Sequence, residues 1–207
     1  MTCIDLTFPH RGVRTATVIE TRHVALKSPA TAYTGVVYKF SHDSMQGSYI
    51  DFPGHILETD DGQRADSVDP ADFYRMDASV IHLDRAHAPG GISAAALEAA
   101  HGGVPRTRAV IINALGAAGP MEIPERSVWL ELGVVDWLKQ VGCRLLVSDV
   151  YESTALEGIF LRLFRAGITA VCEPYDLHKL TVPVVKLTVG FVKLPVTQLP
   201  CTLLAEF

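Results

Sequence analysis

Apolar and polar residues alternate differently in the two parts of this chain. Up to about residue 78, short runs rich in β-branched and apolar residues are separated by polar stretches, a pattern typical of strands and loops. Beyond that point, compact apolar runs alternate with segments whose apolar positions recur every three or four residues, which indicates strands separated by helices. Such alternation favours right-handed crossovers. We therefore expect an α/β protein with a mixed, largely parallel sheet and β-rich terminal segments.

The same pattern places the individual elements. In the first part we expect strands at 3–8, 16–26 and 34–40, an extended run at 45–55, and an acid-rich surface loop with one helical turn between 55 and 78. In the second part we expect strands at 79–83, 109–113, 145–149 and 168–173, helices at 93–101, 130–141 and 154–164, and a β-rich tail at 181–189, 191–195 and 201–206. The third helix is predicted to open with a capping box, Thr154-Ala-Leu-Glu157. No repeat or low-complexity linker divides the chain, so we expect a single domain spanning residues 1–207.

Composition narrows the class of protein. The chain has 207 residues, a formal charge of −5 and no cluster of Lys and Arg, which argues against nucleic acid or an anionic membrane as a partner. No apolar run approaches the length of a membrane span. The cysteines are widely spaced and form no Cys-x-x-Cys pair, which argues against a Cys-rich zinc site and for reduced thiols in a cytoplasmic protein. They are Cys3, Cys143, Cys172 and Cys201.

The run from Met45 to His55 concentrates the chemistry of the first part. In an extended segment the side chains of Tyr49, Asp51 and His55 would share one face. An Asp and a His on one face can ligate a metal or move protons, and a tyrosine beside them can orient substrate or donate a proton. Pro53 favours the edge of a sheet or the end of a strand.

This run resembles the signature of the cyclase family of metal-dependent hydrolases, which includes kynurenine formamidase and isatin hydrolase. The signature reads His-x-Gly-Thr-His-x-Asp-x-Pro-x-His, and this chain has Met-Gln-Gly-Ser-Tyr-Ile-Asp-Phe-Pro-Gly-His at the same spacing. The resemblance extends over most of the chain, through segments 4–6, 137–149 and 164–173. It implies the swivelling β/β/α fold of that family.

The resemblance also implies a site. It assigns metal ligands to Asp51, His55 and Glu173, which would hold one divalent cation, zinc or manganese, or none if the set is too depleted. Non-ligating residues stand where the family has its other histidines, and we expect two of them, with the serine of the signature, to bind substrate. The substituted positions are Met45, Tyr49 and Leu161, and the expected substrate-binding residues are Met45, Ser48 and Leu161.

Three functions stay open. The first is a hydrolase that opens a small-molecule amide, formamide, lactam or lactone with at most one metal. The second is a metal-independent cyclase, dehydratase or isomerase in which His55 and Asp51 act as an acid/base pair, and the third is a non-catalytic small-molecule binding protein. In each case we expect Tyr49, Asp51, His55 and Glu173 to converge on one cavity, with loops 58–72 and 116–125 setting substrate choice. The resemblance implies a homo-oligomer, a dimer or a tetramer.

Overall fold

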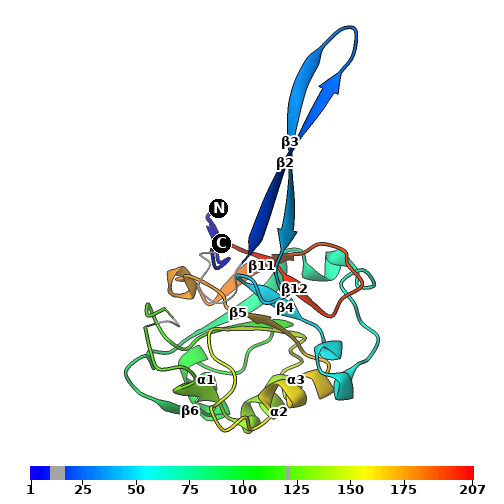
Figure 1. Ribbon diagram of the computed structural model, residues 1–207. Coiled ribbons are helices and arrows are strands. Elements are labelled where there is room, and N and C mark those ends of the chain that lie inside the picture. The colour runs from blue at the N-terminus through cyan, green and yellow to red at the C-terminus, as the bar shows by residue number, and fades with distance from the viewer. Residues whose placement is uncertain (10–16, 120–121) are drawn as a thin grey trace.

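A computed structural model describes residues 1–9, 17–119 and 122–207 (Figure 1). Nine strands form one mixed sheet in the order β1-β13-β11-β5-β7-β9-β10-β4-β12. The four central strands run parallel: β5 (Met76–His82), β7 (Ala109–Asn113), β9 (Leu145–Ser148) and β10 (Thr169–Cys172). Antiparallel strands flank them: β11 (Val184–Gly190), β13 (Thr202–Glu206) and β1 (Cys3–Asp5) on one side, and β4 (Tyr49–Asp51) and β12 (Gln198–Pro200) on the other.

The central strands are apolar throughout because both of their faces are buried. In β7, Val110 and Ile112 belong to one hydrophobic cluster, and Ala109 and Ile111 belong to a second cluster on the opposite face. The first cluster also contains buried side chains from all three helices, which lie together on one face of the sheet (Figure 1). These helices are α1 (Ala94–His101), α2 (Leu132–Gln140) and α3 (Ile159–Arg165).

The predicted α/β class is confirmed, but the parallel pairing is confined to the centre of the sheet. The strands predicted at 16–26 and 34–40 are β2 (Val18–Lys27) and β3 (Ala32–Ser41), which pair only with each other among the described residues. Ala16 lies outside the described part of the chain. A short parallel pair, β6 (Gly90–Ile92) with β8 (Val128–Leu130), was not predicted.

The extended run predicted at 45–55 ends early. The strand stops at Asp51, and Pro53–His55 forms a 3-10 turn, η1, with the proline in the first turn where its missing N–H costs nothing. The loop that follows contains two further turns, η2 (Leu57–Thr59) and η3 (Pro70–Phe73), rather than the single turn expected. The alternation of side chains along a strand therefore does not place His55 on the same face as Asp51.

Two other predictions were wrong. The helix α3 begins at Ile159 and not at Thr154, because the carboxylate of Glu152, rather than the predicted capping box, accepts the backbone N–H groups of Gly158 and Ile159. Segment 191–195 forms no strand and leads into β12. A fourth 3-10 turn, η4 (Leu177–Lys179), precedes β11. No helix in the described part of the chain has the length and apolarity needed to cross a bilayer.

Candidate active site

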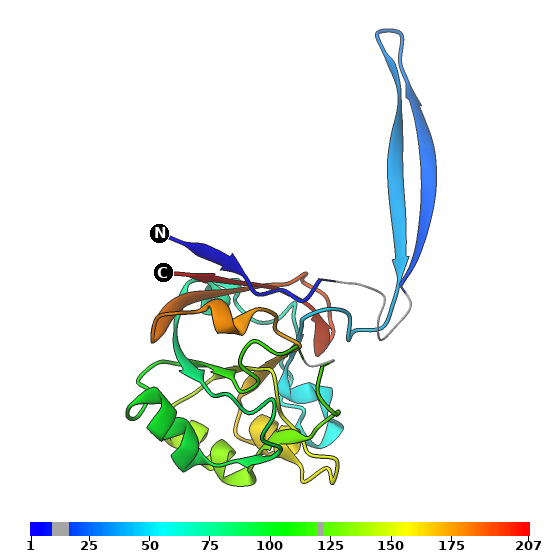
Figure 2. The same cartoon turned by 90° about the vertical axis from the view of Figure 1, so that its left-hand side faces the viewer.

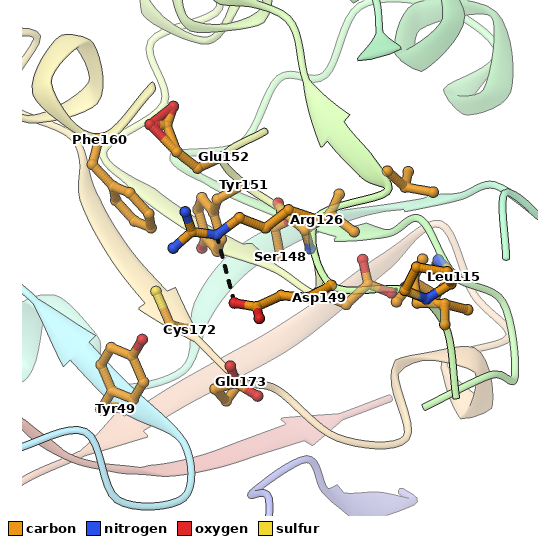
Figure 3. Close-up of a pocket in the computed structure, with 15 residues that line it drawn as sticks. Tyr49, Leu115, Arg126, Ser148, Asp149, Tyr151, Glu152, Phe160, Cys172 and Glu173 are labelled. Carbon is orange, nitrogen blue, oxygen red and sulfur yellow. Dashed lines mark hydrogen bonds and ion pairs between the residues drawn. The ribbon is translucent and has the colours of Figure 1, made fainter. Parts of the chain in front are cut away.

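A cavity of about 170 Å³ opens where β9 and β10 end (Figure 3). The carboxyl ends of parallel strands are where functional groups gather in α/β sheets. Aromatic rings, four carboxylates and one guanidinium line this cavity together, so it offers both apolar contact and charge. Its lining residues are Tyr49, Leu115, Ile123, Pro124, Glu125, Arg126, Val128, Ser148, Asp149, Val150, Tyr151, Glu152, Phe160, Cys172 and Glu173.

Asp149 directly follows β9 and is held in place by the chain itself. Its two carboxylate oxygens accept hydrogen bonds from the backbone nitrogens of Ala114, at 2.8 Å, and Leu115, at 3.0 Å. Burial raises the pKa of this carboxyl to about 6, and these backbone hydrogen bonds offset part of the effect. Asp149 is therefore a fixed acid that changes charge close to neutral pH.

Glu173 directly follows β10 and has φ of 53°, in the left-handed region that non-glycine residues seldom adopt. Its backbone carbonyl accepts a hydrogen bond from the Ser48 hydroxyl at 2.7 Å, and the same hydroxyl accepts one from the Phe8 nitrogen at 2.8 Å. The buried Ser48 hydroxyl thus links the N-terminal segment to the end of β10 through these two hydrogen bonds. In Figure 3 the side chain of Glu173 lies at the wall of the cavity near Tyr49.

Tyr49, Asp51 and Cys172 form a buried cluster beside this wall. In the antiparallel pairing of β4 with β10, Tyr49 is opposite Cys172, so all three side chains share one sheet face. The Cys172 thiol donates to the Asp51 carboxylate, with Sγ 3.6 Å from Oδ2, and interacts with the Tyr49 hydroxyl. Burial raises the pKa of Tyr49 and of Cys172 well above their usual values, so both keep their protons.

Asp51 is 2% exposed, and burial raises the pKa of its carboxyl to about 6. The positive charge available at His55 and hydrogen bonding from Gln198 and Cys172 act in the opposite direction. The other carboxylate oxygen, Oδ1, is buried and accepts no hydrogen bond from the residues that the structure describes. Asp51 therefore contacts the cavity only indirectly, through Cys172 and Tyr49.

Gln198 connects Asp51 to His55. It lies opposite Asp51 in the pairing of β12 with β4, and its Oε1 accepts a hydrogen bond from the Ser44 hydroxyl. Its Nε2 therefore faces His55 Nε2, 3.3 Å away, and donates to that nitrogen when the imidazole carries a single proton on Nδ1. The His55 ring is exposed and contacts the edge of Phe164. His55 and Asp51 are thus bridged by an amide rather than paired directly.

The structure brings only part of the predicted site together. Tyr49 and Glu173 line the cavity, Asp51 lies behind Tyr49, and His55 lies outside the lining. The residues predicted to bind substrate also lie outside the cavity lining. Met45 is 48% exposed, Ser48 is buried and makes the two hydrogen bonds described above, and Leu161 is partly buried on α3. A role for Met45 and Leu161 in binding substrate stays a prediction.

The arrangement of donors does not fit the metal site that the resemblance implies. Among residues 1–9, 17–119 and 122–207, no three side chains of His, Cys, Asp or Glu lie close enough together to hold a metal ion. Asp51, His55 and Glu173 are therefore not assembled as a ligand set. One oxygen of Asp51 faces a thiol, His55 Nε2 faces an amide, and the single unpartnered oxygen of Asp51 falls short of the three protein ligands that a catalytic metal ion usually has.

Several residues of the cavity were missed by the sequence analysis. Asp149 carries the signal of an acid placed directly after an apolar strand. Arg126, with φ of 54°, carries no such signal, because its place depends on the conformation of the loop before β8. Its guanidinium lies 3.8 Å from the Glu125 carboxylate in an exposed pair (Figure 3). The segment predicted to set substrate choice at 116–125 does reach the cavity through Ile123, Pro124 and Glu125, with residues 120–121 outside the described part; segment 58–72 does not.

Comparison with known proteins agrees with this architecture. A family model described as a putative cyclase matches residues 4–153. Isatin hydrolase A from Labrenzia aggregata, solved with benzyl benzoate bound, has a TM-score of 0.75 and 15% sequence identity, over 99% of this chain and 93% of that chain. Isatin hydrolase A from Ralstonia solanacearum has a TM-score of 0.69 and 18% identity, over 99% and 91%.

A predicted metal-dependent hydrolase from Bacillus stearothermophilus also has a TM-score of 0.69, with 13% identity over 99% of this chain and 97% of that chain. No curated protein sequence matches this chain. The likeness to these structures shows the fold, and the family model covers well over half of the chain. The protein belongs to the cyclase family.

Proposed function

We propose that this protein is a small-molecule hydrolase of the cyclase type that opens an amide, formamide, lactam or lactone in the cavity at the ends of β9 and β10. The observation that carries the proposal is Asp149, a partly buried carboxyl with a raised pKa, on the wall of a cavity that is also lined by a guanidinium and by aromatic side chains. The aromatic side chains of Tyr49, Tyr151 and Phe160 suit a flat, unsaturated substrate.

In this proposal Asp149 is the general base. A carboxylate whose pKa lies near the working pH combines the ionised form with useful basicity. It takes a proton from a water molecule as the water oxygen adds to the substrate carbonyl carbon. The carbon–nitrogen or carbon–oxygen bond then breaks, and the proton held by Asp149 passes to the departing nitrogen or oxygen.

The carbonyl oxygen gains negative charge in this step and needs donors. Tyr49 stays protonated because burial raises its pKa. Its single O–H, which faces the Cys172 sulfur in the free protein, turns in this proposal to donate to that oxygen. Within the part of the chain that the structure describes, Arg126 is held by an exposed ion pair with Glu125 at 3.8 Å, a weak interaction that leaves the guanidinium able to bind another anion. The Arg126 guanidinium can bind the carboxylate group that hydrolysis creates on the product. Asp51 acts on the reaction only by positioning Cys172 and Tyr49.

The donor arrangement supports no step through a pair of metal ions, so any bound cation, zinc or manganese, would number at most one per chain. The proposed substrate is a small molecule, as the size of the cavity requires. The four cysteines are unpaired thiols, which supports a reducing compartment such as the cytoplasm.

A second candidate function uses the other end of the cluster. In it His55 and Asp51, which contact the same Gln198 amide, would each exchange a proton with the substrate in a cyclisation, dehydration or isomerisation that needs no metal. The observation that favours it is the contact of Gln198 with His55, with the two Nε2 atoms 3.3 Å apart. Its weakness is that His55 lies outside the cavity lining.

Turnover of isatin tests the proposal, since isatin carries a lactam and two similar structures are isatin hydrolases. We expect ring opening by the wild-type protein, at least about 100-fold loss of kcat in Asp149→Asn, and little loss in Asp136→Asn, which removes an exposed carboxylate paired with Arg162. Loss in His55→Ala with full activity in Asp149→Asn would favour the second candidate. No turnover of isatin, an aryl formamide or a lactone, with ligand binding retained, would indicate a binding protein.

A further inference from the structure

A second, smaller cavity lies next to the proposed active site. It has a volume of about 80 Å³ and is lined by the end of β7 and the loop after it, by Asp149, and by residues 174–178, which include the start of η4. The turn η4, drawn in orange, lies on the opposite side of the sheet from the three helices (Figures 1 and 2). Among the described residues, Asp149 alone lines both cavities. We call the smaller one the acceptor cavity.

The amide of Asn113, which ends β7 and lines the acceptor cavity, has a defined orientation. His82 Nε2 lies 2.6 Å from the carbonyl oxygen of Leu180, and because a carbonyl can only accept, this nitrogen carries a proton. In a neutral imidazole the other nitrogen, Nδ1, is then an acceptor, and Asn113 Nδ2 donates to it across 3.0 Å. The contact with His82 therefore uses the amide nitrogen and leaves the amide oxygen for another partner.

That oxygen has no donor in the structure. Asn113 is 2% exposed, and its Oδ1 is buried and accepts no hydrogen bond from the residues that the structure describes. His82 belongs to β5, on one side of β7, whereas β9 lies on the other side, so Oδ1 is directed towards the end of β9. Asp149 lies there, because its nitrogen donates to the Ile112 carbonyl at 3.4 Å. Two acceptors thus lie side by side, and a buried acceptor without a donor is costly.

The ionisable side chains of the acceptor cavity are mainly acidic. Glu122, Asp149 and Asp176 contribute carboxyl groups, and the one basic side chain among the described lining residues is the exposed imidazole of His178. Asp176 is paired with Lys179 at 2.6 Å, which offsets one of the three acids. A small cavity lined by acids concentrates negative potential, and an unused acceptor requires a hydrogen-bond donor. The ligand that satisfies both conditions is a cation that carries N–H groups.

We propose that the acceptor cavity is a binding site for a primary ammonium group of a small organic molecule. An ammonium group has three donors and no acceptor, so it can donate both to Asn113 Oδ1 and to the lone pairs that the Asp149 carboxylate keeps beside its two backbone hydrogen bonds. A water molecule needs roughly 10–15 Å³ of such volume, so about 80 Å³ has room for an aminomethyl group. A metal ion fits less well, since no three metal-ligating side chains are grouped within the described ranges.

The test is an NMR titration of the isotope-labelled full chain with methylammonium chloride at about pH 7.5, with tetramethylammonium chloride, which has no N–H, holding the ionic strength constant. A ligand of two non-hydrogen atoms binds at best in the millimolar range, so we expect a Kd of about 5–50 mM. The amide signals of Ala114 and Leu115, whose nitrogens donate to Asp149, should shift and saturate. No saturating shift up to about 200 mM, or equal shifts with the neutral acetamide, would overturn the proposal.

Two variants locate the site. Asn113→Leu removes the acceptor at similar size, and Ala118→Leu fills the cavity without removing a polar group. Each should weaken methylammonium binding at least about 10-fold. Ala118 is only half-buried, so its variant gives the result even where circular dichroism shows that Asn113→Leu does not fold. The matched control is Asp136→Asn, which removes an exposed carboxylate paired with Arg162 and should leave the Kd unchanged. Full affinity in Ala118→Leu, or an equal loss in Asp136→Asn, would contradict the assignment.

The ammonium group belongs either to a separate amine or to a substituent of the substrate, and a second measurement distinguishes these sources. It compares kcat/KM for formanilide and for its para-aminomethyl derivative, and this arm rests on the proposed hydrolase function. A preference of at least about 10-fold for the amine, lost in Ala118→Leu, assigns the group to the substrate. Equal values with methylammonium binding intact assign it to a separate amine. Turnover of neither compound counts against the proposed hydrolysis alone, because the titration reports binding without activity.

Discussion

The stability of this protein should fall as pH rises from 4 to 7 because of Asp149. Burial raises the pKa of Asp149 from 3.8 to about 6 in the folded protein. The folded state therefore holds the proton over a pH range in which the unfolded chain has lost it. The stability contributed by this group is complete below pH 4 and is lost as pH rises through 6. About 2.2 pKa units at 1.36 kcal/mol each correspond to about 3 kcal/mol.

Asp149→Asn removes this dependence. The asparagine cannot ionise, and it accepts only one of the two hydrogen bonds from Ala114 and Leu115, so it should cost about 1 kcal/mol that does not vary with pH. Urea denaturation of both proteins at pH 4, 5, 6 and 7 gives the difference in unfolding free energy. That difference should move by about 2 kcal/mol in favour of the variant between pH 4 and pH 7, because part of the effect is already lost at pH 4. If the unfolding free energies of the two proteins changed in parallel with pH, the argument would be refuted. The control Asp136→Asn measures the effect of removing a surface carboxylate.

Three further predictions concern packing around the site, each measured by urea denaturation. Gly47→Ala should lose about 2 kcal/mol or more, because φ is +62° and the added Cβ would lie 2.8 Å from the Phe8 carbonyl oxygen; an unchanged midpoint would contradict this. Tyr151→Phe should lose about 1–2 kcal/mol, since the buried hydroxyl contacts the carbonyls of Val171 at 2.7 Å and Leu146 at 3.1 Å; a neutral effect would show that these contacts contribute nothing. Glu152→Ala should cost about 1–2 kcal/mol, because it removes the acceptor for the first N–H groups of α3. Glu157→Ala, in the predicted capping box, should cost less. A larger loss in Glu157→Ala than in Glu152→Ala would show that the capping box does stabilise the start of the helix.

The central strands could be predicted from sequence because strands buried on both faces have apolar residues at consecutive positions. A run such as Ala109–Asn113 is apolar at consecutive positions only when both faces of the strand are covered. That the β2–β3 hairpin projects from the body could not be predicted, because its sequence does not show which surface, if any, covers it. Alternation identifies β2 and β3 as strands but does not say whether their partners belong to the same copy of the chain.

The site was predictable only as far as local order extends. Tyr49 and Asp51 share a face because both lie on β4, but the turn at Pro53 ends the alternation before His55. Glu173 could be placed because it ends a strand, as does Asp149. Gln198 could not be found, since its contact with His55 spans 143 positions of sequence and depends on the pairing of β12 with β4. The beginning of α3 was misplaced because Glu152, which lies before the predicted capping box, accepts the hydrogen bonds of the Gly158 and Ile159 nitrogens.

The central claim is that carbonyl hydrolysis takes place in the Asp149 cavity without a pair of metal ions. Its most direct test is isatin turnover by protein purified without added metal, measured before and after treatment with a chelator, with elemental analysis of the same samples. The account predicts at most one weakly held divalent ion per chain, turnover retained after chelation, and turnover lost in Asp149→Asn. Two tightly held metal equivalents per chain, with turnover abolished by the chelator and restored by zinc or manganese, would contradict it.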